Sequence, residues 1–445
     1  MFDLLIIGAG PCGYETAAEA AARGLSVGLV ERDQLGGTCL NRGCIPTKAL
    51  CRHAEVVSLM QEAALWGVNI DSPTFDYTTV FQRKEAVVSQ LREGVEMLMK
   101  APGITLIHGE ARIKDSHTIE VNGEEYEARN LIIATGSAPR GLPIEGAHLA
   151  MTSDDILAMP TLPRSLCIVG GGVIGMEFAA VFCTFGVEVT VIEYCKEILP
   201  PFDKDVAKRL RTVLTKRGIR IITGAAVGAI AQGEGCLTVS FELKGKLQDI
   251  QCEKVLMSVG RQPVLPDGLA EAGIVAGKRG IEVDDRMRTS QPNVYAIGDV
   301  NGQMMLAHAA SAQGQVALSD IMGLPCDIRL DIIPSAVFTV PELAMVGLTE
   351  EQCAERSLDV SVRKSFFRSN GKAVAMNETD GLLKLIVDNA TRHIVGCHIC
   401  GAHAADLIQE TVTAMNANAT IDLLAHSIHG HPTLSEVMLA AARQF

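Results

Sequence analysis

Two stretches of the chain share the same order of an apolar strand, a glycine turn and a helix. In the first, the apolar run 4–7 is followed by Gly8, Gly10 and Gly13, and the next strand ends at Glu31. Such glycines let the backbone approach a pyrophosphate, the helix start offers unpaired N–H groups, and an acid about 20 residues further on binds a ribose hydroxyl. The pattern predicts a dinucleotide-binding unit, with a turn-rich loop as the alternative.

The second stretch begins with the apolar run 166–169, continues through Gly170, Gly172 and Gly175, and has a following strand that ends at Glu193. An acid at this point accepts hydrogen bonds from both hydroxyls of an unphosphorylated ribose and repels a 2′-phosphate. The second unit is therefore predicted to prefer NAD to NADP. The alternative for Glu193 is a solvated acid at the end of a strand.

The order of elements also predicts the fold class. A chain of 445 residues is too long for one core and suits roughly two to four domains. Strands alternate with helices along most of it, and the stretch 293–300 is predicted as a strand that delivers Asp299 at its carboxyl end, where ligands sit in open α/β sheets. From about residue 331 the pattern changes to strands and amphipathic helices. We expect an α/β protein with two Rossmann-like units and a C-terminal α+β domain.

Two cysteines follow the first unit at a spacing of five residues. In a regular helix or strand, Cys39 and Cys44 would be too far apart for a disulfide, so pairing requires an irregular turn, which Gly43 and Asn41 can supply. A disulfide that closes such a small ring stabilises the fold little. In a reducing cytosol, a disulfide that persists is more often catalytic or redox-sensing. Lys48 and a helix start would provide the positive setting that thiol reactivity needs. We interpret the two as a redox pair; the alternative is two ordinary buried cysteines on a helix.

Composition narrows the class of partner and the compartment. The formal net charge of −13 opposes a general affinity for nucleic acid or anionic membranes. The 13 cysteines have no regular framework spacing, as expected for mostly reduced thiols in a cytoplasmic protein. The most apolar regions contain Glu177 and Glu188 and are broken by glycines, so no transmembrane span is predicted.

Two clusters near the C-terminus contain histidines. In the tail, Thr433 and Glu436 have the spacing of a helix capping box, and Glu436 can also orient His431 as a carboxylate–imidazole acid–base dyad. Both roles can hold, and His429 is predicted to be structural. Upstream, Cys397 and Cys400 invite a metal interpretation, but on a strand they point to opposite faces. We expect packing thiols there and no metal site.

The segment 36–48 resembles the active-site segment of the class I pyridine nucleotide-disulfide oxidoreductases. The resemblance implies that Cys44 packs against a flavin, that Cys39 exchanges with substrate, and that Lys48 lies near the reactive nitrogen of the flavin and pairs with Glu177. A surface acid on a helix is the alternative for Glu177. The first dinucleotide unit, next to the redox motif, is thereby assigned to FAD.

Further motifs extend the resemblance along the chain and imply its domains. They are an FAD-binding domain in 1–145, an NAD-binding domain in 146–265, a second part of the FAD-binding domain in 266–330, and a dimerisation domain in 331–445. The resemblance places Asp299 on the ribityl chain of the flavin, and the helix that residues 304–308 open can stabilise a negatively charged flavin. The other residues that it assigns to cofactor binding are Gly37, Thr38, Ala134, Thr135, Gly136, Gly260, Met305, Leu306, Ala307 and His308.

Within the family, the dihydrolipoyl dehydrogenase branch fits best. The resemblance implies that electrons pass from dihydrolipoamide through the Cys39–Cys44 disulfide and FAD to NAD⁺, with His431 and Glu436 serving the disulfide of the other subunit in a homodimer. Lipoyl-domain carrier proteins of 2-oxo acid dehydrogenase or glycine cleavage complexes would be the partners. Ala309 stands where that branch usually has a lysine, and a glutamine replaces its glutamate four residues later. An NADH-dependent disulfide reductase and a docking component of a multienzyme complex therefore stay as alternatives.

Overall fold

The computed structural model describes residues 1–71 and 74–445, which form two compact units. Each unit is assembled from three stretches of the chain. The first contains Met1–Ala49, Thr78–Arg140 and Gly260–Leu330, and the second contains Leu50–Tyr77, Gly141–Val259 and Asp331–Phe445. The predicted FAD-binding stretches, 1–145 and 266–330, both contribute to the first unit. The exact domain boundaries stay a prediction.

The first unit is built on a sheet whose central strands are parallel. Its strands are β1 (Phe2–Ile7), β2 (Val27–Glu31), β3 (Ile104–His108), β4 (Ala111–Ile113), β5 (Thr118–Val121), β6 (Glu124–Ile133) and β18 (Val294–Ala296). They follow the order β3-β2-β1-β6-β5-β4, and β18 also pairs with β6. Along β1, Leu4 and Ile6 enter one core while Leu5 and Ile7 enter another. A parallel sheet covered on both faces needs such uninterrupted apolar strands.

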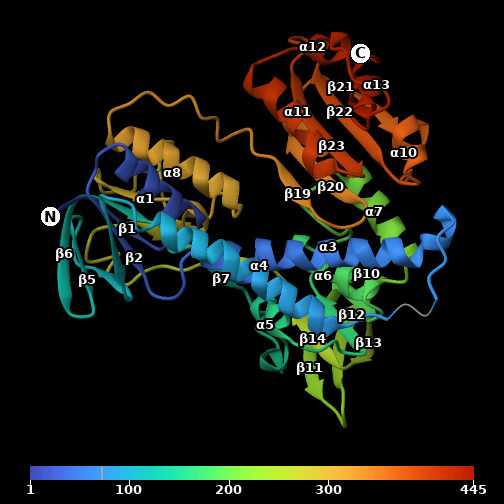
Figure 1. The fold of residues 1–445 in the computed structure, drawn as a ribbon, viewed down its shortest axis with the longest axis horizontal. Coiled ribbons are helices and arrows are strands. Elements are labelled where there is room, and N and C mark those ends of the chain that lie inside the picture. The colour runs from blue at the N-terminus through green and yellow to red at the C-terminus, as the bar shows by residue number, and fades with distance from the viewer. Residues whose placement is uncertain (72–73) are drawn as a thin grey trace. The chain divides into compact units, whose positions relative to one another are not determined.

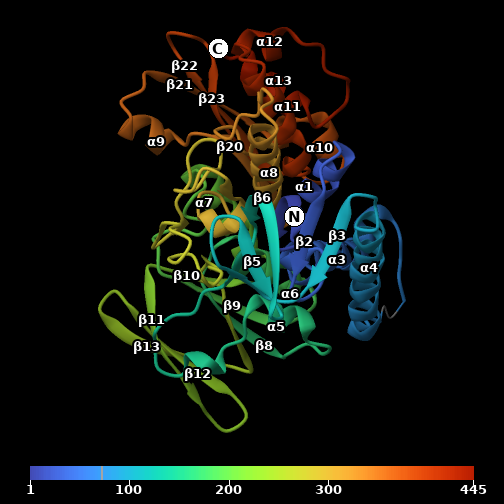
Figure 2. The same cartoon turned by 90° about the vertical axis from the view of Figure 1, so that its left-hand side faces the viewer.

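Helices from distant parts of the chain cover this sheet. Helix α1 (Pro11–Ala22) and helix α8 (Ala307–Ile321) lie side by side, as Figure 1 shows in blue and gold. Helix α4 (Tyr77–Leu98) packs into the same core as β3 (Figure 2). The late segment that carries β18 and α8 thus completes the unit that the N-terminus begins.

The second unit contains a repeat of the same strand–turn–helix order. Its parallel sheet has the order β10-β9-β8-β14. The elements are β8 (Ser165–Val169), α6 (Val173–Thr184), β9 (Glu188–Glu193), α7 (Lys204–Lys216), β10 (Arg220–Thr223) and β14 (Lys254–Met257), with an antiparallel sheet of β11 (Ala225–Gln232), β12 (Leu237–Leu243) and β13 (Lys246–Cys252). Both predicted strand–turn–helix units are confirmed, so a turn-rich loop is the wrong interpretation of the first glycine run.

The C-terminal part of the second unit is an α+β layer, as predicted. Its antiparallel sheet has the order β19-β20-β23-β22-β21. The elements are β19 (Ser335–Val337), β20 (Glu342–Gly347), β21 (Val360–Phe366), β22 (Leu382–Asp388), β23 (Ile394–Gly401), α11 (Ala404–Asn416), α12 (Ile421–His426) and α13 (Glu436–Ala442). Cys397 and Cys400 lie on β23, and burial raises the pKa of each thiol to about 12. They occupy the packing positions expected of thiols on a strand.

Shorter elements complete the described chain. They are α5 (Ser153–Ala158), α9 (Glu350–Glu355), α10 (Gly371–Ala375), the 3₁₀ turns Ala63–Trp66, Ala147–Leu149, Gly298–Asn301 and Phe367–Ser369, and the strands β7 (Ser137–Pro139), β15 (Arg261–Pro263), β16 (Ala276–Gly277) and β17 (Gly280–Ile281). Among the described residues, no helix combines the length and the apolar character that crossing a membrane requires.

A buried lysine joins α7 to the C-terminal sheet. Lys384 on β22 has a side chain that is 2% exposed, and its Nζ lies 2.8 Å from Asp203 Oδ2, 2.8 Å from Asp205 Oδ2 and 2.5 Å from Glu350 Oε2. Asp203 is fully buried, whereas Asp205 and Glu350 are partly open to solvent. A buried ammonium is tolerated because carboxylates surround it.

The lowered pKa of Asp205 in this cluster makes the stability of the fold depend on pH in the acid range. Burial alone would raise the pKa of Asp205, but hydrogen bonds from Lys364 and Lys384 hold it at about 2, below its ordinary value of 3.8. A lowered folded-state pKa stabilises the fold above the unfolded-state value, and this contribution disappears as the pH falls through the folded-state value. We expect Asp205→Asn to lower the urea midpoint at pH 7, and the gap to wild type to close between about pH 4 and pH 2. A gap that stays constant down to pH 2 would contradict the assignment.

Candidate active site

The two predicted redox cysteines lie on either side of a break between two helices. Helix α2 (Gly37–Arg42) carries Cys39, Gly43 interrupts the chain, and helix α3 (Cys44–Gln61) begins at Cys44. A Cβ on Gly43 would lie 2.9 Å from the Thr38 carbonyl oxygen, so only glycine permits this return of the backbone. The predicted irregular turn is confirmed at Gly43, and the alternative of two cysteines on one helix is wrong.

The two sulfurs influence one another directly. Cys39 is half-buried and Cys44 is exposed. The hydrogen bond between Cys39 and the Cys44 sulfur raises the pKa of the Cys39 thiol most strongly, burial raises it further, and Lys48 opposes both. Because only a thiolate is nucleophilic, Cys39 needs a nearby base to react.

Asn41 anchors this segment, although it lies within α2 and does not form the turn that the sequence suggested. Its Nδ2 donates to the carbonyl oxygens of Leu35 and Gly37, each at 3.0 Å. The Gly36 N–H donates to Ala9 O at 2.8 Å, which fastens the segment to the first glycine turn. The Asn41 Oδ1 is buried and has no hydrogen-bond partner within the described chain. A bound group with a donor at this place would satisfy it.

The first glycine turn has the shape that a dinucleotide requires. Gly8 has a φ of +105°, and a Cβ there would lie 2.4 Å from Ala134 O. At Gly10, by contrast, no atom lies within 4 Å of the Cβ position, which leaves open space where a pyrophosphate approaches in such folds. The Glu31 carboxylate accepts hydrogen bonds from Ala9 N at 2.7 Å and from Asp33 N at 2.8 Å. These residues fit the adenosine and pyrophosphate part of FAD.

The second glycine turn reproduces this arrangement. Glu193 is buried, and its carboxylate accepts hydrogen bonds from Gly171 N at 2.5 Å and from Cys195 N at 2.6 Å. The space beside Gly172 is open within 4 Å of its Cβ position. The alternative of a solvated acid at a strand end is therefore wrong for Glu193. The carboxylate is held beside a turn that fits NAD.

A cluster around Asp299 was not predicted in full. Ser137 Oγ donates to Asp299 Oδ2 at 2.5 Å, and Arg261 donates to both the Oγ and the carbonyl oxygen of Ser137 at 2.7 Å. Strand β7, which begins with Ser137, pairs with β15, which begins with Arg261. The sequence placed Asp299 at the end of a strand, but Arg261 and Ser137 gave no signal beyond their position in apolar motifs.

Gln313, the departure from the dihydrolipoyl dehydrogenase pattern, holds the turn that carries Asp299. Its side chain is buried, and its Oε1 accepts hydrogen bonds from Gly298 N at 2.7 Å and from Asn301 Nδ2 at 2.9 Å. Ala309, the other departure, is 1% exposed. The amide oxygen of Gln313 supplies the acceptor that these two donors need, so this substitution preserves the local fold.

The other predicted cofactor residues lie on the same first unit. Thr135 Oγ1 donates to Val264 O at 2.6 Å, and Leu306 is the residue before the first turn of α8. The predicted cofactor-binding positions that lie in this unit are Gly13, Gly37, Thr38, Lys48, Ala134, Thr135, Gly136, Gly260, Asp299, Met305, Leu306, Ala307 and His308. Gly175 and Glu177 lie on α6 in the second unit.

Glu177 is not a helix-surface acid. It is 3% exposed, and its Oε1 accepts a hydrogen bond from the Phe338 N–H at 3.0 Å. A buried carboxylate of this kind is retained where it has partners. Its pairing with Lys48 stays a prediction.

The predicted dyad is formed in the C-terminal tail. His431 Nδ1 lies 3.0 Å from Glu436 Oε1, and the imidazole is 79% exposed. The hydrogen bond from the Thr433 N–H, and next that from His431, lower the pKa of the Glu436 carboxyl. Glu436 thus stays ionised and holds the ring through Nδ1, which leaves Nε2 outward.

The predicted capping box is only half formed. Glu436 accepts from Thr433 N at 2.9 Å, but the Thr433 hydroxyl donates to Gly430 O, and α13 begins after Ser435 without a side-chain cap. The Thr433 hydroxyl is turned away because the helix starts later than the motif predicts. His429, by contrast, is buried against Glu410 at 2.9 Å, in keeping with a structural role.

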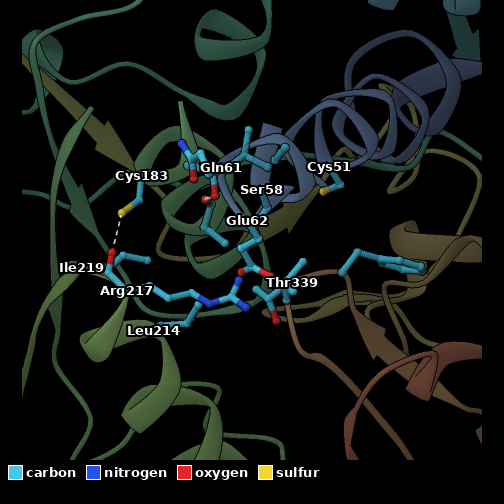
Figure 3. A pocket seen from close by; sticks show the side chains of 15 residues that line it. Cys51, Ser58, Gln61, Glu62, Cys183, Leu214, Arg217, Ile219 and Thr339 are labelled. Carbon is cyan, nitrogen blue, oxygen red and sulfur yellow. Dashed lines mark hydrogen bonds between the residues drawn. The ribbon is translucent and has the colours of Figure 1, made fainter. Parts of the chain in front are cut away.

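A separate pocket of about 190 Å³ lies within the second unit. It is lined by the C-terminal parts of α3, α6 and α7, by Glu62, Arg217 and Ile219 just beyond helix ends, and by residues 338–340. Figure 3 shows the Arg217 side chain reaching toward Glu62 and Thr339, while the Cys183 thiol donates to Arg217 O at 3.5 Å. None of the residues predicted for catalysis or cofactor binding lines it.

Comparison with protein families matches almost the whole chain. Residues 2–314 match the pyridine nucleotide-disulphide oxidoreductase family, and residues 333–442 match the dimerisation domain of the same family. The two matches divide the chain close to the point where the sequence pattern changes.

Individual relatives agree with the family match. The dihydrolipoyl dehydrogenase of Chlamydia pneumoniae is 41% identical over 99% of this chain and 96% of its own, and that of Geobacillus stearothermophilus is 39% identical over 99% and 95%. Among solved structures, the HOCl-induced flavoprotein disulfide reductase RclA from Escherichia coli is similar with a TM-score of 0.88, at 30% identity over 99% of each chain.

Proposed function

Because the chain belongs to the pyridine nucleotide-disulphide oxidoreductase family, we propose that it is a dihydrolipoyl dehydrogenase, which oxidises dihydrolipoamide and reduces NAD⁺. The observation that carries the proposal is the contact between the Cys39 and Cys44 sulfurs on a segment fastened to the first glycine turn. Full-length relatives of that name support the substrate.

Residues of both units would hold the two cofactors. Glu31 and the turn at Gly10 would bind the adenosine and pyrophosphate of FAD, and Asp299 its ribityl chain. Glu193 and the turn at Gly172 would bind NAD⁺. When bound, FAD supplies an acceptor for an electron pair and NAD⁺ an acceptor for hydride.

The chain's own residues account for the thiol chemistry. A thiolate of dihydrolipoamide attacks Cys39 of the Cys39–Cys44 disulfide, forms a mixed disulfide, and releases Cys44 as a thiolate. The second substrate thiolate then attacks the substrate sulfur of the mixed disulfide, so that lipoamide leaves as a cyclic disulfide and Cys39 as a thiolate. His431 takes the proton of the first attacking thiol, releases it to solvent, and then takes the proton of the second, while Glu436 stabilises the imidazolium formed each time. The products are oxidised lipoamide and the reduced cysteine pair.

The dimerisation domain supports a homodimer. In such a dimer, His431 of one protomer acts as the base at the partner subunit's Cys39, so a monomer would lack a complete site. The carrier of the substrate would be a lipoyl domain, and the compartment the cytoplasm.

The central test is NAD⁺ reduction by free dihydrolipoamide with the purified protein. Fast NADH formation is expected. The second candidate, an NADH-dependent reductase of another disulfide, is favoured by Ala309 and by the similarity to the disulfide reductase RclA. A flavin spectrum without turnover of dihydrolipoamide, together with oxidation of NADH by another disulfide, would replace the first proposal with the second.

Glu193 should determine the choice between NAD⁺ and NADP⁺. Replacing Glu193 with serine removes the carboxylate that would bind both ribose hydroxyls and repel a 2′-phosphate. We expect KM for NAD⁺ to rise about tenfold, the effect of one lost charged hydrogen bond, while KM for NADP⁺ falls. Steady-state assays with both nucleotides measure the ratio. An unchanged ratio would show that Glu193 does not contact the ribose.

A further inference from the structure

The segment after Glu193 closes the second glycine turn and is anchored at three places. At its start, Cys195 N donates to Glu193 Oε1 at 2.6 Å. In its middle, Leu199 N donates to Gly171 O at 2.9 Å, and Leu199 is fully buried with a φ of +51°. A non-glycine residue keeps this conformation only when its surroundings enforce it. The residues 194–203 therefore have a defined conformation beside the second glycine turn.

The end of this segment is held by the C-terminal sheet. Asp203 caps α7, because its Oδ1 accepts a hydrogen bond from Asp205 N at 3.0 Å. Its other oxygen, Oδ2, accepts from Lys384 Nζ at 2.8 Å, and neither side chain is more than 2% exposed. Figure 1 shows α7 in green beside the sheet strands β20 and β23, with which it is in contact. Lys384 thus reaches from one layer of the unit into the other.

We propose that Lys384 is a positioning residue for the dinucleotide, acting through Asp203 on the segment 194–203. Its ion pairs are with Asp203, Asp205 and Glu350, so its effect would be transmitted through the chain. Its ammonium holds the C-terminal end of a segment whose N-terminal end holds the Glu193 carboxylate. Loosening that end lets the Leu199–Gly171 contact and the Glu193 carboxylate shift from the geometry that binds ribose.

The three carboxylates around Lys384 allow a matched test. Asp203→Asn keeps a good helix cap but removes the charge that faces Lys384, and Asp205 and Glu350 continue to pair the lysine. Glu350→Gln also removes one of the three charges, but Glu350 belongs to α9 and lies outside the segment. Only Asp203→Asn removes the ion pair that joins Lys384 to the segment 194–203.

The experiment is calorimetric titration of each FAD-loaded protein with ADP-ribose, a probe that does not undergo hydride transfer. For Asp203→Asn we expect about tenfold weaker binding, the effect typical of residues that act through an intervening element. Glu350→Gln is expected to bind within about twofold of wild type, as for most partly exposed substitutions. In steady-state assays, KM for NAD⁺ rises in parallel with the dissociation constant, whereas KM for dihydrolipoamide is unchanged.

Three results would contradict this role. They are equal losses in the two variants, an unchanged affinity in Asp203→Asn, and a loss that appears in kcat alone. The inference rests on the proposed NAD site, and the wild type separates the two: if wild type does not bind ADP-ribose, the NAD site itself is wrong. If Asp203→Asn does not fold, the double variant with Lys384→Met, which leaves no buried charge unpaired, is titrated in its place with the same expectation.

Discussion

Replacement of Cys44 with serine is expected to abolish NAD⁺ reduction by dihydrolipoamide, with a loss of at least about a thousandfold, because a hydroxyl cannot form the disulfide or leave as a thiolate. The rest of the site is undisturbed, since Cys44 is the exposed first residue of α3. The variant should therefore keep its flavin and its ability to bind NAD⁺.

The measurement compares, under anaerobic conditions, the bleaching of the flavin absorbance by NADH with that by dihydrolipoamide. In Cys44→Ser, NADH should still bleach it, whereas dihydrolipoamide should not. Cys326→Ser is the matched control, because Cys326 is another exposed thiol of the first unit outside every predicted site. If Cys44→Ser turns over dihydrolipoamide at a rate near wild type, the redox pair is assigned wrongly.

Replacement of His431 with glutamine should produce the second largest loss. General acid–base catalysis contributes about 10²–10⁴-fold, and we expect kcat/KM for dihydrolipoamide to fall within that range at neutral pH. Without the imidazole, only the small fraction of dihydrolipoamide that is already a thiolate at neutral pH can attack Cys39.

The pH dependence distinguishes a lost base from a lost structure. Above about pH 8.5 the substrate thiols ionise without help, so the deficit of His431→Gln should shrink as the pH rises. His403→Asn is the matched control: His403 is exposed, its Nδ1 lies 3.8 Å from Asp406, and asparagine tolerates its left-handed backbone. A deficit that is constant from pH 7 to pH 9 would exclude His431 as the base.

The two dinucleotide units hold their glutamate side chain in the same way. In each, a glutamate at the end of the second strand accepts a hydrogen bond from the glycine turn and another from the residue two positions further on. Both backbone donors hold the carboxylate before any ribose arrives, and this lowers the cost of ordering it on binding. As predicted ribose-binding residues, Glu31 and Glu193 would then be acceptors held in place before the nucleotide binds.

Features that depend on neighbours in the chain could be predicted from the residues alone. The strand–turn–helix order of both units, the break at Gly43 and the contact of His431 with Glu436 all involve groups within a few residues of each other or within one repeating pattern. Backbone sterics and local hydrogen bonds govern such features. The order of residues therefore specified two dinucleotide folds, a thiol pair and an imidazole–carboxylate pair.

Features that join distant segments required the folded chain. Asp299 meets Ser137 across 162 positions, and Lys384 meets Asp203 across 181. Nothing in the local pattern distinguishes such a buried lysine from a solvated one, because its partner is chosen by which helix and sheet pack together. Burial makes the pairing of Lys384 with Asp203 obligatory, since an ammonium or carboxylate is stable away from water only beside its counterpart. The tertiary structure therefore determines which charged side chains are buried against a partner and which face solvent.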